Sequence, residues 1–541
     1  MEFIAGINDN RLSTSLTRWA EVMTRQSRNV DRRHVLKSTA AAAIAANLPS
    51  ITAADENATP SGANLTANLI ATENEQPGTT AWQLTRVRIN EGTYRTSLIE
   101  GYCSHQSIAA GDTLQIFVST KPARKFTLDV YRLGYYDGKG GCHKATFGPL
   151  EGKSQPVPAI GPLPGRLREC QWDASVEIKI PTEWISGVYL GKLTTIPKSK
   201  DEPYWQSYVI FIVKDNRHAD CLFQCSDNTW QAYNRWPENE SLYTHPQGAH
   251  APGVAVSFDR PYGKYTQIFD HPLSIGSGEF LLWEFPLCYW LEQHGYDVTY
   301  GSNVDTCDTA FVNRCRTFIS VGHDEYWDQR QYHAVEAVMK EGVNLLWLCG
   351  NSVFVDSPFS PSSTGRVDRI ITRAGCYGDL RVDELESYEA MFAGLKSTAP
   401  DERRIMGVRS VVPFNGGGDW TCAKPNHWLF EDTDMKLGDS IPGLVGWEHH
   451  GEPNPTVRDM TVVAEGPVWS GGTREGRYES VVFSGSKGNV IFNASTIFWA
   501  QGLSSPPGHI IPWSHYSRPH GPDARVHQMT RNLLTRALQV Q

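Results

Sequence analysis

The pattern of hydrophobic residues changes at about residue 216, and this change constrains the fold more than any other feature of the sequence. Before it, short runs that alternate apolar and polar residues, such as Thr113–Val118 and Phe126–Tyr131, are separated by glycine-rich turns. Alternation with a period of two residues is typical of strands with one buried face. No helical period interrupts these runs. The sequence therefore predicts an N-terminal β-sandwich of the immunoglobulin or fibronectin type over residues 85–215.

In the second part of the chain, strand-like and helix-like runs alternate. Arg316–Val321 and Val343–Leu348 are typical of buried strands, whereas Asp328–Glu341 has its apolar residues on one helical face. This alternation predicts a doubly wound α/β domain over residues 216–541, with a parallel sheet and helices on both faces. In such sheets ligands bind beyond the carboxyl ends of the strands. The segment from about 360 to 475 shows no clear pattern.

The N-terminus has the layout of a bacterial twin-arginine export signal. Arg32 and Arg33 precede a mildly apolar run, Ser38–Leu48, which small residues suited to cleavage follow. We therefore expect a signal peptide over residues 1–54 and a polar linker over residues 55–84. The mature protein would be periplasmic or extracellular, and it would fold and acquire any cofactor before export. The alternative is a chance arginine pair before an alanine-rich linker.

Composition excludes some classes of function. The net charge of −9, with no long basic run, argues against nucleic acid as a partner. No apolar stretch outside the leader is long enough to predict a membrane-spanning helix. The eleven cysteines are odd in number and form no paired C-x-x-C framework, so a packing role is the expectation for most of them.

The stretch SVGHDEYW lies where a predicted strand gives way to a predicted helix. His323 and Glu325 are two residues apart, so both side chains can point into one crevice at the strand end while Asp324 points elsewhere. Glu325 would serve there as a metal ligand or general base, and His323 as a ligand, an acid–base group or a hydrogen-bond donor. In the alternative interpretation Asp324 caps the helix and His323 only packs.

The segment that follows the first strand of this domain is rich in tyrosine. CSDNTWQAYNRW contains Tyr233, and SLY contains Tyr243. Tyrosinate is a hard oxygen donor that suits a ferric ion, and two tyrosines with one glutamate would leave coordination positions open for water and substrate. The alternative is a surface loop whose aromatic residues are anchored in the core.

Several motifs in this part of the chain carry a resemblance to a known family. In order, they are CSDNTWQAYNRW, SLY, VSFDRPY, WLEQHGYDVTY, SVGHDEYW, CGNSVF and PGLVGWE, between about residues 216 and 510. With these motifs the chain resembles the catalytic domain of the N,N-dimethylformamidase large (beta) subunit, for which we expect a glutamine-amidotransferase-like fold. The most specific part is GHDEYW with the Gly–Asn strand end. The predicted β-sandwich is similar to the front domain of many exported relatives and unlike that of dimethylformamidase.

The resemblance implies a mononuclear iron, expected as Fe3+, held by two tyrosines and one glutamate. Glu325 of GHDEYW matches the glutamate, and Tyr243 of SLY and Tyr233 of WQAYN match the tyrosines. Tyr262 and Tyr265 are alternatives to Tyr233, because the loop is shorter here.

The resemblance also implies three polar residues around the substrate, namely His323, Asn351 and Glu448. In the implied mechanism the metal acts as a Lewis acid, His323 or Glu448 moves a proton, and Asn351 donates a hydrogen bond to the developing oxyanion. A formamide or another small amide would be hydrolysed. Since dimethylformamidase works with a small subunit, an accessory subunit or a homo-oligomer is an expected partner.

Three other functions compete with this interpretation. Cys349 at a strand-to-helix elbow would suit a cysteine nucleophile, but Trp347 stands where the elbow needs glycine. A zinc hydrolase would draw on scattered histidines, although no H-E-x-x-H helix occurs. Those histidines are His245, His250, His323, His449 and His450. The non-enzyme alternative is an exported binding or surface protein with a degenerate catalytic domain.

Overall fold

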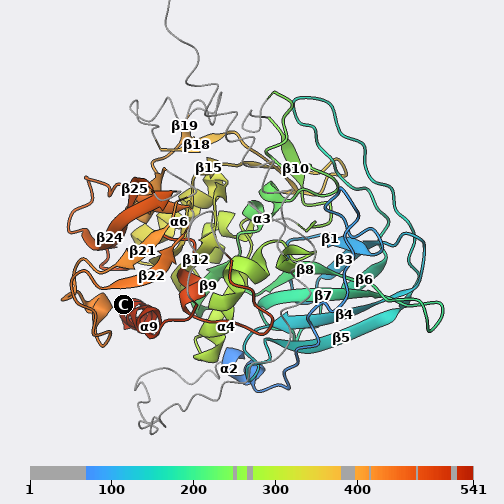
Figure 1. Ribbon diagram of the computed structural model, residues 1–541, viewed down its shortest axis with the longest axis horizontal. Coiled ribbons are helices and arrows are strands. Elements are labelled where there is room, and N and C mark those ends of the chain that lie inside the picture. The colour runs from blue at the N-terminus through green and yellow to red at the C-terminus, as the bar shows by residue number, and fades with distance from the viewer. Residues whose placement is uncertain are drawn as a thin grey trace, which may run out of the picture. The chain divides into compact units, whose positions relative to one another are not determined.

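The computed structural model describes residues 69–247, 253–264, 272–378, 397–412, 416–446, 448–470, 473–512 and 521–539 (Figure 1). Residues 66–541 form one compact unit. It is a mixed α/β structure with several β-sheets, and strands outnumber helices in the described ranges. The predicted export signal and residues 55–68 of the predicted linker lie outside the described residues.

Two sheets whose strands pair mainly antiparallel, called the front sheets below, form the first part of the unit. The five-stranded sheet has the order β2 (Ser107–Ala109), β8 (Gln206–Lys214), β7 (Gly187–Thr195), β4 (Phe126–Leu133), β5 (Gly141–Leu150). The three-stranded sheet has the order β1 (Glu100–Cys103), β3 (Thr113–Ser119), β6 (Val176–Lys179). Ile116 of β3 shares a buried cluster with Leu128 of β4 and Phe211 of β8, so the two sheets enclose one core. The alternating runs in the sequence correctly predict β3 and β4.

A seven-stranded sheet forms the second part. Its order is β11 (Val298–Gly301), β9 (Ala219–Gln224), β12 (Cys315–His323), β14 (Asn344–Gly350), β26 (Val490–Asn493), β25 (Thr473–Ser484), β24 (Thr461–Ser470). The first five strands are parallel, as the sequence predicts. The prediction is wrong for β25, which pairs antiparallel with β26 and with β24; β24 itself lies in the segment without a clear sequence pattern. Strands β24 and β25 are adjacent in sequence, with Ser470 paired to Thr473, and such a short connection allows only an antiparallel pair.

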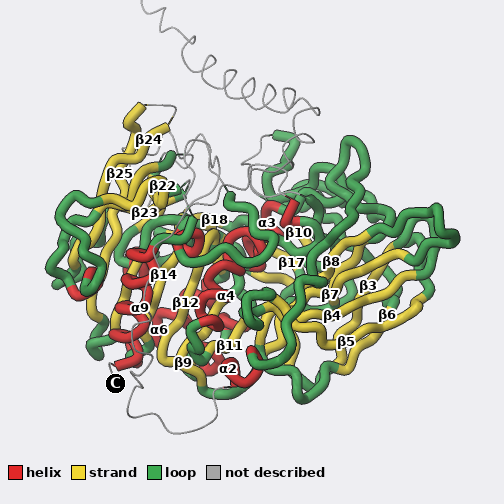
Figure 2. Tube along the Cα trace, turned by 60° about the horizontal axis from the view of Figure 1, so that its bottom comes forward, coloured by secondary structure: helices red, strands yellow, loops and turns green. Residues whose placement is uncertain are grey.

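Helices cover both faces of this sheet, as predicted (Figure 2). On one face α4 (Phe285–Gln293) and α9 (Ala524–Gln539) share a core with Ile319 and Leu346. On the other, α6 (Gln329–Glu341) shares a core with the neighbouring strand residues Phe318 and Leu345. Successive strand residues therefore point to opposite helical layers, which explains why β12 and β14 are buried almost throughout.

Helix α6 begins and ends as its sequence dictates. Asp328 is the N-cap and accepts a hydrogen bond from the Arg330 amide, while Gly342 ends the helix at φ 108°, a left-handed conformation suited to glycine. The alternative that Asp324 caps this helix is therefore wrong. Asp324 instead accepts hydrogen bonds from the side chains of Gln224 and Ser320, in a buried polar network behind the strand end.

The remaining elements are short. Helices and helical turns are α3 (Asp227–Tyr233), α5 (Thr309–Val312), α8 (Arg403–Met406), Pro272–Ser274, Asp305–Cys307, Trp428–Phe430, Trp499–Gly502 and a π-helical segment, Phe280–Glu284. Strands are β10 (Ala255–Ser257), β13 (Tyr326–Trp327), β15 (Val355–Asp356), β16 (Phe359–Ser360), β17 (Ile370–Thr372), β18 (Gly375–Tyr377), β19 (Ser397–Ala399), β20 (Arg409–Val411), β21 (Gly418–Thr421), β22 (Ser440–Val445) and β23 (His449–Gly451). No helix in the described ranges is long and apolar enough to cross a membrane.

Residues 69–84, at the end of the predicted linker, are ordered against both parts of the unit. They contain α2 (Leu69–Asn74), and they bury Ile70 and Trp82. The Asn74 amide donates a hydrogen bond to Glu292 of α4, and Arg132 of β4 forms a fully buried ion pair with the same carboxylate. The front sheets are therefore joined to the α/β part by a polar network centred on a fully buried ion pair.

Candidate metal centre

The candidate site lies at the carboxyl ends of two neighbouring parallel strands. His323 ends β12 and is in register with Gly350, which ends β14. A Cβ atom at Gly350 would lie 2.0 Å from the carbonyl oxygen of Glu448, so glycine is needed for the close approach of that distant segment. The strand ends thus bring together residues more than a hundred positions apart in sequence.

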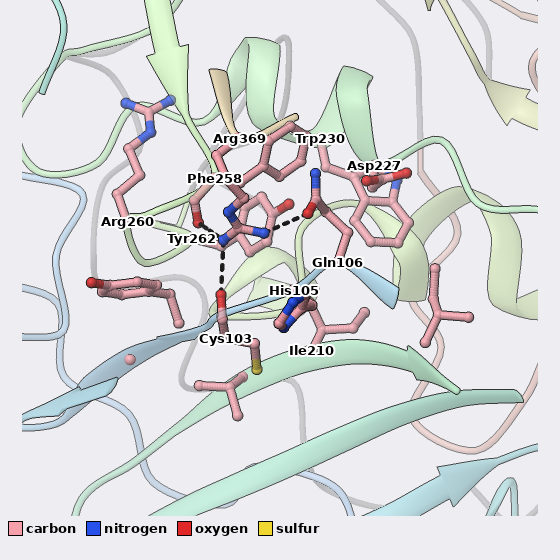
Figure 3. A pocket seen from close by; sticks show the side chains of 15 residues that line it. Cys103, His105, Gln106, Ile210, Asp227, Trp230, Phe258, Arg260, Tyr262 and Arg369 are labelled. Carbon is pink, nitrogen blue, oxygen red and sulfur yellow. Dashed lines mark hydrogen bonds between the residues drawn. The ribbon is translucent and has the colours of Figure 1, made fainter. Parts of the chain in front are cut away.

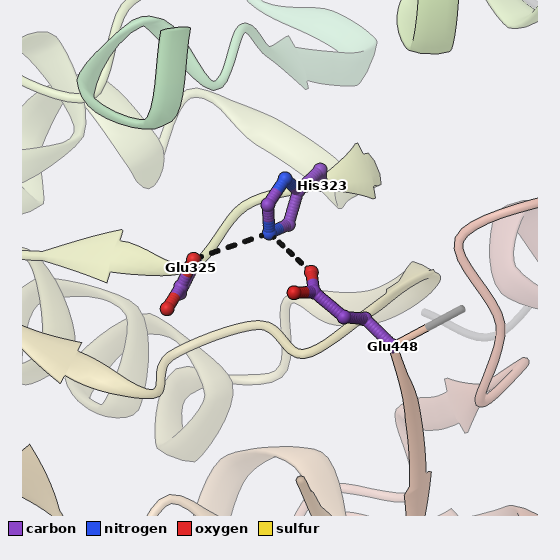
Figure 4. Close-up of side chains that lie close together, drawn as sticks. All are labelled: His323, Glu325 and Glu448. Atoms are coloured by element: carbon purple, nitrogen blue, oxygen red, sulfur yellow. Dashed lines mark ion pairs between the residues drawn. The ribbon is translucent and has the colours of Figure 1, made fainter. Parts of the chain in front are cut away.

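His323, Glu325 and Glu448 form a buried cluster (Figure 4). The Nε2 atom of His323 lies 2.5 Å from Oε2 of Glu448 and 3.2 Å from Oε2 of Glu325. One ligand atom from each of the three residues lies within 4.8 Å of the others. The three side chains could therefore hold one metal ion, and Figure 4 shows both carboxylates directed at the same ring nitrogen.

Tyr233 and Tyr243 reach the same carboxylate from the side of α3. The Tyr233 hydroxyl donates to Oε2 of Glu325 at 2.6 Å and lies 2.9 Å from the Tyr243 hydroxyl. The Tyr243 hydroxyl lies 3.5 Å from Oε1 of Glu325. The two rings are stacked, with centroids 4.9 Å apart. The structure therefore brings together five of the six site residues that the sequence predicts.

Asn351, the sixth, follows the strand end beside His323 in an unusual backbone conformation. Its φ of 51° is left-handed, and so are those of Val353 (52°) and Glu448 (61°). This conformation is strained for Val353, whose side chain is β-branched, and backbone strain of this kind is common at functional sites. The side chain of Asn351 is buried, and its Oδ1 has no hydrogen-bond partner among the described residues. The Asn351 side chain thus follows the strand end with its acceptor atom Oδ1 not engaged by the described residues.

Burial and charge set the protonation of these groups. Burial alone would lower the pKa of His323, but Glu448, with Glu279 and Glu325, raises it well above its ordinary value. Burial raises the pKa of Tyr233 well above its ordinary value, and Glu325 beside it acts in the same direction. Without a cation, His323 is therefore an imidazolium and Tyr233 a neutral phenol.

The donor set fits a metal ion. The hydroxyl oxygens of Tyr233 and Tyr243 and the carboxylate of Glu325 are separated by 2.6, 2.9 and 3.5 Å. Ligand atoms about 2.0–2.2 Å from one ion lie about 3 Å apart, so these oxygens could share one. Three carboxyl groups, from Glu279, Glu325 and Glu448, face one buried imidazole, and this excess of acid favours a bound cation.

Three further residues near the site were not predicted from the sequence. The hydroxyl of Tyr326 forms a hydrogen bond with that of Tyr243, and the Arg373 guanidinium lies over the Tyr243 ring, 4.6 Å from its centroid. Glu279 lies 3.8 Å from Nδ1 of His323. Tyr326 is adjacent to Glu325 in GHDEYW and could have been considered on that ground. Arg373 and Glu279 come from distant segments without a motif.

Of the rival zinc candidates His323 joins this cluster, whereas His450, His245 and the proposed nucleophile Cys349 are not part of it. His450 accepts a hydrogen bond from the Ser352 amide through Nε2 and contacts Asn493 through Nδ1, so both of its nitrogens are used. Burial raises the pKa of the Cys349 thiol to about 12, which disfavours the thiolate that a nucleophile requires. The Nδ1 atom of His245 accepts a hydrogen bond from the Gln247 amide in a local turn. His250 and Tyr265 lie outside the described residues.

A separate small cavity of about 30 Å³ lies between the front sheets and α3 (Figure 3). Asp227, Trp230 and Tyr262 line it beside Arg369, whose guanidinium bonds to Gln106 and the Cys103 carbonyl. None of the six predicted site residues lines this cavity. It has room for about one or two waters.

The fold and the site define a class: a mixed α/β protein with a buried carboxylate, imidazole and phenol cluster at the edge of a parallel sheet. The chain belongs to the N,N-dimethylformamidase beta subunit-like family, whose C-terminal model matches residues 127–515. This confirms the resemblance carried by the sequence motifs, and the match begins inside β4 of the front sheets. A search of curated proteins found no match.

Proposed function

We propose that the protein is a metal-dependent hydrolase of a small amide, with iron held by Tyr233, Tyr243 and Glu325. Family membership supports amide hydrolysis. The observation that carries the site is the meeting of both phenols and the imidazole on the one carboxylate of Glu325, inside the core. A formamide is the substrate that the family name suggests.

A bound ion would polarise the amide carbonyl and make a water easier to deprotonate. The other steps belong to side chains of this chain. Glu448 accepts a proton from the attacking water, and the imidazolium of His323, 2.5 Å away, delivers a proton to the departing nitrogen. Asn351 donates a hydrogen bond from its amide nitrogen to the carbonyl oxygen as negative charge develops. Water and amide thus give a carboxylic acid and an amine.

An alternative ligand set has a specific observation in its favour. His323, Glu325 and Glu448 are close enough to share one ion, and an imidazole with two carboxylates suits zinc. The reaction would still be hydrolysis, but the two tyrosines would then bind substrate. Glu325 belongs to both sets.

The wider setting is also part of the proposal. We infer export by the twin-arginine route to the periplasm or beyond, an immunoglobulin-like front domain over 85–215, and an amidotransferase-like catalytic domain over 216–541. A small accessory subunit or a homo-oligomer completes the assembly. The paired arginines, the two front sheets with one core and the parallel sheet support these inferences.

The test is metal analysis with a visible spectrum on the purified protein, for the wild type and Glu325→Ala. We expect one iron per chain and a tyrosinate-to-iron absorption band, both lost in the variant. Glu336→Ala, in α6 and paired with Lys340, is the matched control and should keep both. Amides are then screened. Zinc without the band would favour the alternative set, and a folded wild type that binds no offered metal would refute the proposal.

A further inference from the structure

A third tyrosine lies in the site beside the two proposed ligands. Tyr326 is fully buried in β13, held by its pairing with Val355 of β15. Its ring meets that of Tyr233 edge to face, with centroids 5.9 Å apart, and its hydroxyl forms a short hydrogen bond with that of Tyr243. The structure gives Tyr326 no contact with Glu325 like those that Tyr233 and Tyr243 make, so it lies one layer further out.

Arg373 approaches Tyr243 from another side. It follows β17, is almost completely buried, and places its guanidinium 4.6 Å from the centre of the Tyr243 ring. A cation over an aromatic face is attracted to it, more strongly where water is excluded. Tyr243 thus has a hydrogen bond with Tyr326 at its oxygen and a cation–π contact with Arg373 at its ring.

We propose that Tyr326 and Arg373 are positioning residues for Tyr243 in the metal-loaded protein: Tyr326 donates a hydrogen bond to the ligand oxygen, and Arg373 fixes the ring. The proposal rests on the proposed role of Tyr243 as a ligand. A phenol oxygen bound to a cation has no proton to give, so Tyr326 must be the donor of the hydrogen bond between them. Partners of this kind orient a ligand and tune its donor strength.

The hydrogen bond has a spectroscopic consequence. By drawing electron density from the Tyr243 oxygen, it lowers the energy of the electrons that move to the metal on light absorption. The tyrosinate-to-iron band therefore lies at shorter wavelength than it would without Tyr326. A side chain that only filled space would leave the band where it is.

The experiment compares metal content, band position and metal affinity, measured by chelator competition, in the iron-loaded wild type and Tyr326→Phe. We expect the variant to bind one iron per chain, with the band moved to longer wavelength and the affinity about 10- to 100-fold lower. Tyr332→Phe is the matched control. Its ring is equally buried, but its hydroxyl donates to the Asp401 carbonyl, so it should leave all three readings unchanged.

Other outcomes overturn the inference. An unshifted band with unchanged affinity would show that the hydrogen bond does not act on the ligand. Loss of iron and band in a folded variant would make Tyr326 a ligand itself. If Tyr326→Phe does not fold, Arg373→Lys decides: loss of the flat guanidinium contact should shift the band, and no shift overturns the proposal. If the wild type shows no such band, the proposed tyrosinate site is refuted together with this inference. If the wild type shows the band and neither variant moves it, only this inference is refuted.

Discussion

The buried ion pair between Arg132 and Glu292 should dominate the stability of the junction between the front sheets and the α/β part. Both side chains are fully buried, and the contact is bidentate, at 2.8 and 3.0 Å. Glu292 also accepts hydrogen bonds from Asn74 and Tyr300, at 2.9 and 2.8 Å. Four donor atoms from three separate elements therefore converge on one carboxylate.

The perturbation is Glu292→Gln, which keeps the shape and removes the charge. It leaves the Arg132 guanidinium buried without its counter-ion and turns an amide toward it. Breaking a buried pair in this way costs about 3–5 kcal/mol, because the remaining charge is not solvated. At roughly 2–4 °C per kcal/mol, or somewhat less in a unit of this size, the midpoint of thermal unfolding should fall by several degrees.

The matched control is Asp173→Asn, which breaks the ion pair with Lys153 at the surface. Those side chains are 79% and 53% exposed, so this pair contributes about 0–1 kcal/mol. Thermal unfolding followed by circular dichroism compares the two variants with the wild type. If Glu292→Gln lowers the midpoint no more than Asp173→Asn does, the reasoning about the buried junction is refuted.

Two further predictions concern the site and its support. His450 accepts from the Ser352 amide, and burial lowers its pKa to about 4, so it stays neutral while an unfolded histidine gains a proton below about pH 6.5. The contribution of His450 to the free energy of unfolding should be fully present above pH 6.5 and fall by about 3 kcal/mol toward pH 4. Denaturant titrations at several pH values should show a smaller pH dependence in His450→Gln. Glu279→Gln should lower kcat about 10- to 100-fold with little change in KM, since Glu279 orients the His323 ring; a raised KM with normal kcat would contradict this.

Much of the α/β part follows from local pattern. Helix α6 is fixed by Asp328 at one end and Gly342 at the other. The direction of β24 and β25 could not be read in the same way, because a period of two residues is common to parallel and antiparallel strands. Most strands between 360 and 451 have only two to four residues, too short for any period to be visible.

The site was predictable to different degrees for different residues. His323 and Glu325 follow from their place at a strand end, since alternate residues share a side of the chain. Tyr233 and Tyr243 are possible oxygen donors in a tyrosine-rich segment, whereas Asn351 and Glu448 entered through resemblance to the family's motifs. The structure explains why the residues alone could not supply Glu448: it reaches His323 through the close contact of its backbone with Gly350, a tertiary contact that leaves no local pattern.

The stretch GHDEYW divides its polar side chains between two tasks. Asp324 turns back into the protein, where Ser320, Gln224 and Asn303 satisfy it and fix the strand end. His323 and Glu325 turn the other way, toward Glu448, and Glu279 also faces the His323 ring. The first network needs nothing further, whereas the second gathers carboxyl groups around one imidazole and leaves an oxygen of Glu279 without a partner in the described chain. This gathering of buried acidic groups around one imidazole supports the proposed cation site.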